Sequence, residues 1–341
     1  MSEKRSGCVT SILVVVLVIS GVLNLALILA GSAKLVRGTG AGVRRSASFH
    51  EPVVKSGEAL EGEGGKRVAV ISIRGVINSA EPGSVGESAL EDTLEEIAQA
   101  RTDDTVAAVV LRIDSPGGEV TASDILYRAV RQLREKKPVV VSMDSVAASG
   151  GYYVACAGTH VFAHETTLTA SIGVIMQALN YQHLLGKVGL EVVTFKSGAF
   201  KDMLNGAREL TEAEREYVQG MINQSYDRFV GIVARERRLE EGLLRKGVAD
   251  GRIVSGRDAL SAGLVDEIGG FEEALEKARA LGKAPGAAAI RYTAPMALGR
   301  LLRFLNQAPA KGGKVEVDFG GRLQGKLENG RIYYLSSLLV P

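Results

Sequence analysis

The stretch "PVVVSMDSVAASGGYYVACAG", residues 138–158, joins a run of β-branched apolar residues to a segment made mostly of alanine and glycine. A short apolar run of this kind predicts a buried strand, and the small residues after it predict a tight turn into a helix. Ser149 stands in that turn. It is either a nucleophile raised on a strand-to-helix turn or a small residue that lets the helix pack closely.

Strand and helix patterns alternate along the chain on both sides of this stretch. Upstream, in order, are "RVAVISI" (67–73), the helical "ALEDTLEEIAQA" (89–100), "VAAVVLRI" (106–113) and the helical "ASDILYRAVRQLREK" (122–136). Downstream are the strand candidates 160–164, 171–176 and 191–195 and the helix candidates 211–239 and 271–280. This alternation predicts an α/β fold with buried, mainly parallel strands.

The composition describes a globular protein without a nucleic-acid surface. The chain has 341 residues, 46% of them hydrophobic and 23% charged, with a formal net charge of +2 and no tryptophan. Single-stranded nucleic acids bind basic surfaces interleaved with aromatic residues, so we expect no nucleic-acid partner. The two cysteines, Cys8 and Cys156, allow at most one disulfide. We expect neither a metal nor a cofactor.

An uncharged apolar segment at residues 9–30 is long enough as a helix to cross a hydrocarbon core of about 30 Å. It exceeds the length of about 7 to 15 residues typical of the apolar part of a cleaved signal peptide, so we expect a permanent anchor. The expected division is a flank at 1–8, the anchor at 9–30, a glycine- and serine-rich stalk at 31–65, one folded domain at 66–282 and an extension at 283–341. More basic residues follow the span than precede it, which by the positive-inside rule favours a cytoplasmic domain.

Backbone donors that could stabilise an oxyanion occur in "DSPGGEV", residues 114–120. Proline and two glycines turn the chain sharply here, so the N–H groups of Gly117 and Gly118 can point into a site. Adjacent parallel strands end at the same edge of a sheet, and the next strand in sequence ends at Ser149. Two donors and a nucleophile at one edge would suit acyl transfer.

The base that would activate Ser149 is not an evident histidine. His50 lies in the stalk, His160 and His164 flank a strand candidate, and His183 lies in a polar helical pattern. A desolvated lysine can take this role. "FKSGAFKDML", residues 195–204, supplies Lys196 and Lys201, and "TASIGVI", residues 169–175, supplies Ser171, whose hydroxyl could orient a lysine.

Five motifs in a fixed order resemble the bacterial signal peptide peptidase A family, which are membrane-anchored Ser/Lys-dyad peptidases on the Clp protease and crotonase fold. They are "DSPGG", "SVAASGGYY", "TASIGVI", "SGAFKD" and "ADGRIVSGRDALSAGLVDEIGG", between residues 114 and 270. The resemblance implies Ser149 as nucleophile, Lys201 as general base and acid, and Ser171 as the residue that positions Lys201. It also implies an oxyanion hole made by Gly117 or Gly118 with the N–H of Ser149.

The same resemblance implies the partners and the location. The expected substrates are cleaved signal peptides and other unfolded apolar peptides. The expected assembly is a closed ring, a homo-octamer, in which Ser149 of one protomer meets Lys201 of its neighbour. The domain would lie on the extracytoplasmic side of the cytoplasmic (inner) membrane, held there by the N-terminal helix, which the charge pattern opposes.

Three other functions fit parts of the pattern. A crotonase-type acyl-CoA enzyme would use glycine amides with a carboxylate such as Glu119 or Glu165. A non-catalytic scaffold would keep the fold alone, and a related peptidase class would cut specific membrane-protein tails. The apolar end "GRIYYLSSLLVP", residues 330–341, is either an edge strand on a neighbouring subunit or a tail able to enter a substrate groove.

Overall fold

The computed structural model describes residues 49–52, 65–79, 89–293 and 333–335. The expected membrane helix at 9–30 and most of the expected stalk lie outside these residues. Within the described part, no helix has both the length and the apolar character needed to cross a membrane.

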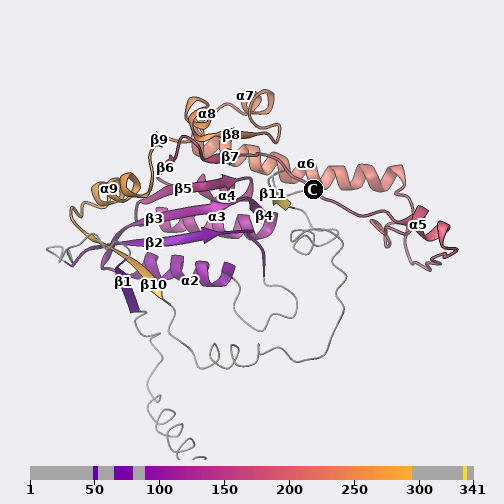
Figure 1. The fold of residues 1–341 in the computed structure, drawn as a ribbon, viewed down its shortest axis with the longest axis horizontal. Coiled ribbons are helices and arrows are strands. Elements are labelled where there is room, and N and C mark those ends of the chain that lie inside the picture. Colours follow the sequence, from indigo (N-terminus) through magenta and orange to yellow (C-terminus); the bar gives the residue numbers. More distant parts are fainter. Residues whose placement is uncertain (1–48, 53–64, 80–88, 294–332, 336–341) are drawn as a thin grey trace, which may run out of the picture. The chain divides into compact units, whose positions relative to one another are not determined.

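A mostly parallel sheet forms the centre of the fold, as the sequence predicts (Figure 1). Its order is β1-β10-β2-β3-β5-β6-β9, and the neighbours from β10 to β9 are parallel. The strands are β1 (Phe49–Pro52), β2 (Arg67–Arg74), β3 (Val106–Ser115), β5 (Val139–Ala148), β6 (His160–Ala163), β9 (Glu267–Ile268) and β10 (Ala288–Thr293). Two short strands lie beside the end of β5: β7 (Leu168–Ala170), parallel to it, and β8 (Ile253–Ser255), antiparallel to β7.

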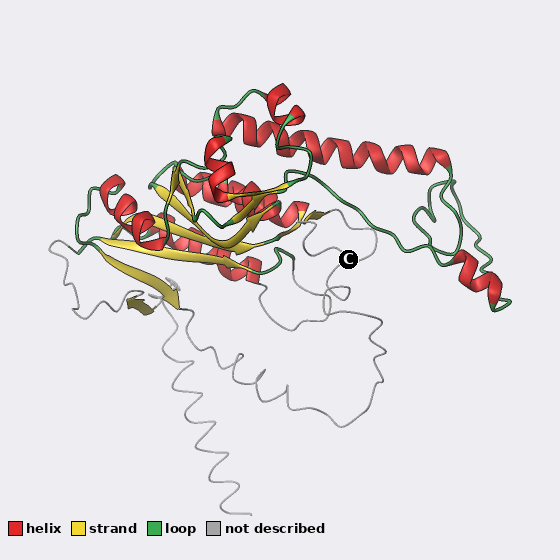
Figure 2. Cartoon of the chain, turned by 45° about the horizontal axis from the view of Figure 1, so that its top comes forward, coloured by secondary structure: helices red, strands yellow, loops and turns green. Residues whose placement is uncertain are grey.

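Helices cover both faces of the sheet, which explains why its strands read as continuous apolar runs. In β2, Val68 and Val70 pack in one core cluster with residues of α9 (Phe271–Leu281), whereas Ala69 and Ile71 pack in the other. That second cluster takes in residues of α2 (Ala89–Thr102), α3 (Val120–Arg134) and α4 (Gly150–Ala155). Figure 2 shows the helices on the two sides of the strands.

The helix predicted at 211–239 is α6 (Glu212–Arg237), and the capping box of Thr211 and Glu214 opens it. Its buried apolar residues all lie in its second half, from Phe229 to Ala234. The shorter helices are α5 (Gln182–Lys187), α7 (Glu241–Lys246) and α8 (Gly256–Ser261). The strand predicted at 191–195 is wrong, because this segment is exposed and pairs with no neighbouring strand, so it stays irregular.

Residues outside 66–282 also join the fold. β1 lies in the segment assigned to the stalk, and β10 lies in the segment assigned to the C-terminal extension. A last strand, β11 (Tyr333–Leu335), pairs antiparallel with β4 (Gly117–Glu119) in a separate two-stranded sheet.

Glu96 of α2 makes the stability of this fold depend on pH. Burial, and to a smaller extent Asp92, raises the pKa of Glu96 to about 7. The folded chain therefore holds a proton that the unfolded chain has lost between about pH 5 and 7, and its free energy of unfolding falls as the pH rises through that window. We expect Glu96→Gln to raise the melting temperature by several degrees at pH 8 and to change it little at pH 5. An equal shift at both pH values, measured by calorimetry, would contradict the titration.

Candidate active site

Ser149 occupies a strained turn between β5 and α4. Its backbone angles are φ 53° and ψ −115°, a region that residues other than glycine rarely adopt. Such strain costs about 1–3 kcal/mol and is found mainly at functional sites. The residue is fully buried, and its Oγ has no hydrogen-bond partner among the described residues. A strained turn with an unengaged hydroxyl fits a nucleophile better than a packing residue.

Glycines let the chain pass close to this turn. A Cβ atom added to Gly150 would lie 2.5 Å from Ser123 Oγ and 3.1 Å from the amide nitrogen of Gly118. A Cβ atom added to Gly118 would collide with Ile77. Gly117 has φ +102°, so it combines a close approach with a backbone conformation that favours glycine. The sequence therefore needs "GG" in both loops for β4 and α4 to touch.

The amide donors differ in part from those expected. The N–H of Ser149 was expected in the oxyanion hole, but it donates to the carbonyl oxygen of Ala170 at 2.8 Å. The N–H of Gly117 donates to Ser115 Oγ at 3.1 Å, a contact that the serine of "DSPGG" could have indicated. Gly150 is the first residue of α4, where an amide has no acceptor within the helix. Gly118 and Gly150 are therefore the donors best placed for an oxyanion.

Ser171 follows a strand that is paired with the strand before Ser149. Ala170 of β7 is opposite Ala148 of β5, so the two serines are the next residues at adjacent strand ends. Ser171 is buried, has φ 50°, and donates its N–H to the carbonyl oxygen of Arg252. The structure brings Gly117, Gly118, Ser149 and Ser171 to one edge of the sheet.

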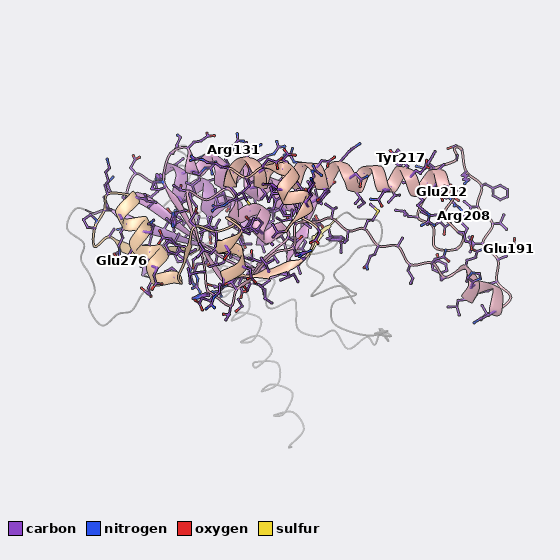
Figure 3. The ribbon with its side chains drawn as sticks, turned by 90° about the horizontal axis from the view of Figure 1, so that it is seen from above. Arg131, Glu191, Arg208, Glu212, Tyr217 and Glu276 are labelled. Atoms are coloured by element: carbon purple, nitrogen blue, oxygen red, sulfur yellow. The ribbon has the colours of Figure 1, made fainter. Side chains whose placement is uncertain are left out.

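Lys201 is not brought to this edge within the chain. It is exposed and lies in an arm, residues 176–211, that precedes α6. In Figure 3, Glu191 and Arg208 of this arm lie with Glu212 and Tyr217 at the end of α6 that carries no buried apolar cluster. Within a single chain, the predicted nucleophile and the predicted base are thus apart.

Ion pairs give the loop around Lys201 a defined shape. Arg208 contacts Asp202 at 2.7 Å and Glu214 at 2.5 Å, and Lys196 contacts Asp202 at 2.7 Å. Arg208 holds the pKa of both carboxyls well below their usual values. Lys196 is therefore engaged within the arm, whereas Lys201 and Lys187 are both exposed in it.

The other candidate side chains do not contact Ser149 Oγ through a hydrogen bond. Glu119 accepts a hydrogen bond from Ser79, and Glu165 pairs with Arg257 on the surface at 2.6 Å. His160 lies 3.1 Å from Glu267, and burial lowers its pKa. The side chain of His50 is outside the described residues, and His183 belongs to α5 in the arm. His164 is exposed at the end of β6, and neither these carboxylates nor a described histidine bonds to Ser149 Oγ.

Known proteins match the chain over this same region. The profile of peptidase family S49 matches residues 131–284, and that of Clp protease matches residues 62–181. A putative protease of Methanocaldococcus jannaschii is 43% identical over 56% of this chain and 61% of its own length. A putative signal peptide peptidase SppA of Enterococcus faecium is 35% identical over 68% of each chain, and a putative protease of Synechocystis is 40% identical over 63% of this chain and 74% of its own.

The chain belongs to peptidase family S49. The family classes it as a serine peptidase on a Clp protease-like fold, which agrees with the strained serine and with the parallel sheet. The turn at Ser149, the glycine turn and Ser171 of this S49 chain lie within the matched residues, and so does the arm with Lys201.

The strain at Ser149 gives a stability test. Glycine adopts a positive φ without a steric cost, whereas alanine keeps the Cβ that causes the strain. We expect the free energy of unfolding of Ser149→Gly to be about 1 kcal/mol higher than that of Ser149→Ala. Both variants lack the hydroxyl, so the difference reports the backbone strain alone. Urea denaturation of the two variants measures the difference. Equal stabilities, or a more stable alanine variant, would show that the turn is not strained.

Proposed function

We propose that the protein is a membrane-anchored endopeptidase in which Ser149 and Lys201 form a catalytic dyad. The observation that carries the proposal is the strained, buried and unpartnered Ser149 beside the amides of Gly118 and Gly150. Family S49 membership supports the serine as nucleophile, and the exposed Lys201 is the base that the ordered motifs indicate.

The proposed mechanism uses this chain's groups in two half-reactions. The neutral amine of Lys201 takes the proton of Ser149 Oγ, which attacks the carbonyl carbon of the peptide bond. The Gly118 and Gly150 amides stabilise the oxyanion, and the Lys201 ammonium returns the proton to the leaving amine. Water then resolves the acyl-enzyme with Lys201 again as the base, and Ser171 orients the lysine. Because an ammonium cannot accept a proton, activity falls in acid.

Lys201 reaches the site from a neighbouring copy of the chain in this proposal. The arm that carries it exposes large apolar side chains: Leu179, Leu184, Val188, Leu190, Val192, Val193, Phe195 and Phe200. Phe195 is 96% exposed, and a group of large apolar side chains exposed to solvent marks an interaction site. Copies related by a closed rotation would each cover the arm of the next, and we propose a ring of about eight.

The substrates we propose are cleaved signal peptides and other unfolded apolar peptides at the membrane. Ser149 is fully buried, so an extended segment can reach it more readily than a folded surface can. The Enterococcus relative carries the name of a putative signal peptide peptidase. Residues 9–30 would hold the domain at the extracytoplasmic face of the inner membrane, although the basic residues after the span favour the opposite topology.

The dyad predicts a sharp contrast between two lysines. Ser149→Ala and Lys201→Ala should each lower peptide hydrolysis by about 10³-fold or more, because each removes a group that acts in the transition state. Lys196→Ala is the matched control in the same loop and should keep most of the activity. Initial rates on a quenched fluorescent peptide, with circular dichroism to confirm folding, make the comparison. Comparable losses in the two lysine variants would remove Lys201 as the base.

Sharing of the site predicts complementation. When inactive Ser149→Ala and Lys201→Ala chains assemble together, a site made of an intact serine and an intact lysine should form at about a quarter of positions by random mixing. Hydrolysis should return to about that fraction of the wild-type rate. Mixed assemblies that are verified by mass spectrometry and remain inactive would place both residues in one chain.

A further inference from the structure

One of the five ordered motifs, the one that begins "ADGR" at residue 249, has no part in the proposed mechanism but contacts Ser171. The carbonyl oxygen of Arg252 accepts the N–H of Ser171 at 2.9 Å. β8, which starts directly after Arg252, pairs antiparallel with β7, the strand that ends directly before Ser171. A Cβ atom added to Gly173 would lie only 3.3 Å from the Cα atom of Gly251. The turn at 250–252 therefore packs directly against the segment that carries Ser171.

Two consecutive residues at the end of β7 adopt a backbone conformation that residues with a side chain rarely take. Ala170 has φ 61° and Ser171 has φ 50°. Strained residues of this kind persist only where the surrounding structure holds them in place. Here two hydrogen bonds do so: the carbonyl oxygen of Ala170 accepts the Ser149 N–H at 2.8 Å, and the Ser171 N–H donates to Arg252. The direction of the Ser171 side chain therefore depends on where the Arg252 carbonyl group lies.

Asp250 fixes the position of that carbonyl group. Its carboxylate accepts the backbone N–H of Arg252 at 3.1 Å, the bond that defines an Asx turn, and Gly251 between the two residues has φ +90°. The guanidinium of Arg252 binds the same carboxylate with Nε at 2.8 Å and with Nη2 at 2.5 Å. Hydrogen bonds from Arg252 lower the pKa of Asp250 to about 2, so the pair stays charged at neutral pH.

This ion pair shapes the turn more than it stabilises the domain. The side chains of Arg252 and Asp250 are 61% and 43% exposed. An exposed ion pair contributes little to the free energy of unfolding. What the pair fixes is the backbone from Asp250 to Arg252, which ends at the carbonyl group bonded to Ser171.

We propose that Asp250 is a positioning residue of the peptidase. Together with Arg252 it holds the turn whose carbonyl group keeps Ser171 in its positive-φ conformation, and this aims the Ser171 hydroxyl at the base. The proposal rests on the proposed function, in which Ser171 orients Lys201. No bond of the reaction is made or broken at Asp250. Loosening the turn should therefore misplace the base and slow the chemical step without weakening the binding of the peptide.

Steady-state kinetics on a quenched fluorescent peptide tests this proposal. Asp250→Ala should lower kcat about ten-fold and leave KM within about two-fold of the unmodified value. Asp250→Asn keeps an acceptor for the Arg252 N–H and should lower kcat only about two- to three-fold. Arg257→Ala is the matched control, because it removes an exposed ion pair, 2.6 Å from Glu165, and should keep the unmodified kcat. Circular dichroism melts establish that each variant is folded. If Asp250→Ala does not fold, Arg252→Ala replaces it in the comparison.

A double-mutant cycle with Ser171→Ala separates positioning from a general loss of structure. Ser171→Ala alone should be about as slow as Asp250→Ala. If Asp250 acts through the Ser171 hydroxyl, Asp250→Ala should slow a chain that already carries Ser171→Ala by less than about two-fold. Losses that multiply, a raised KM at unchanged kcat, full activity of Ser171→Ala, or an equal loss in Arg257→Ala would overturn the proposal.

Ser149→Ala, measured in the same series, separates the two levels of the proposal. If Ser149→Ala is inactive while Asp250→Ala keeps the unmodified kcat, the positioning role of Asp250 is wrong and the peptidase function stands. If Ser149→Ala hydrolyses the peptide as fast as the unmodified chain, the Ser149 peptidase function itself fails.

Discussion

The site depends on a close approach of two backbone segments at glycine residues. β4 passes α4 where Gly117 and Gly118 face Gly150, at separations that leave no room for a Cβ atom. This approach is what brings the backbone amide groups of two loops close together beside Ser149. Ser149 takes a positive φ in the same turn, where it is the single residue between the end of β5 and the start of α4. Dense packing and catalytic geometry are therefore the same constraint here.

Polar contacts connect α4, the helix that follows Ser149, to α6. Tyr153 of α4 donates to Asp124 of α3 at 2.7 Å, and Arg228 of α6 donates to the same carboxylate at 2.6 Å. Burial alone would raise the pKa of Asp124, but the hydrogen bonds from Tyr153 and Arg228 lower it below its usual value. This charged hydrogen-bond network attaches the second half of α6 to the core. The first half, toward the arm, has no buried apolar residue among those that the structure describes.

The sequence predicts the sheet well and the site in part, for identifiable reasons. Apolar runs such as 106–113 are buried on both faces, so local composition determines them, and the capping box at Thr211 marks where α6 begins. Ser149, Gly117 and Gly118 could be found because strand ends and glycine turns have local signatures. The partner of the Ser149 N–H, Ala170, could not, since it depends on how β7 pairs with β5.

Long-range contacts also explain why the C-terminal strand escapes local reasoning. Nothing within residues 333–335 indicates that they pair with β4, more than two hundred positions earlier, or that Ser225 accepts from Tyr334. The apolar character of the tail predicts only that it seeks an edge. β11 finds an edge on both sides, because Gly118 pairs with Tyr334 and Ile175 exchanges two hydrogen bonds with Tyr333. The side chain of Tyr334 adds a second contribution, because its ring packs against the rings of Tyr153 and Phe229.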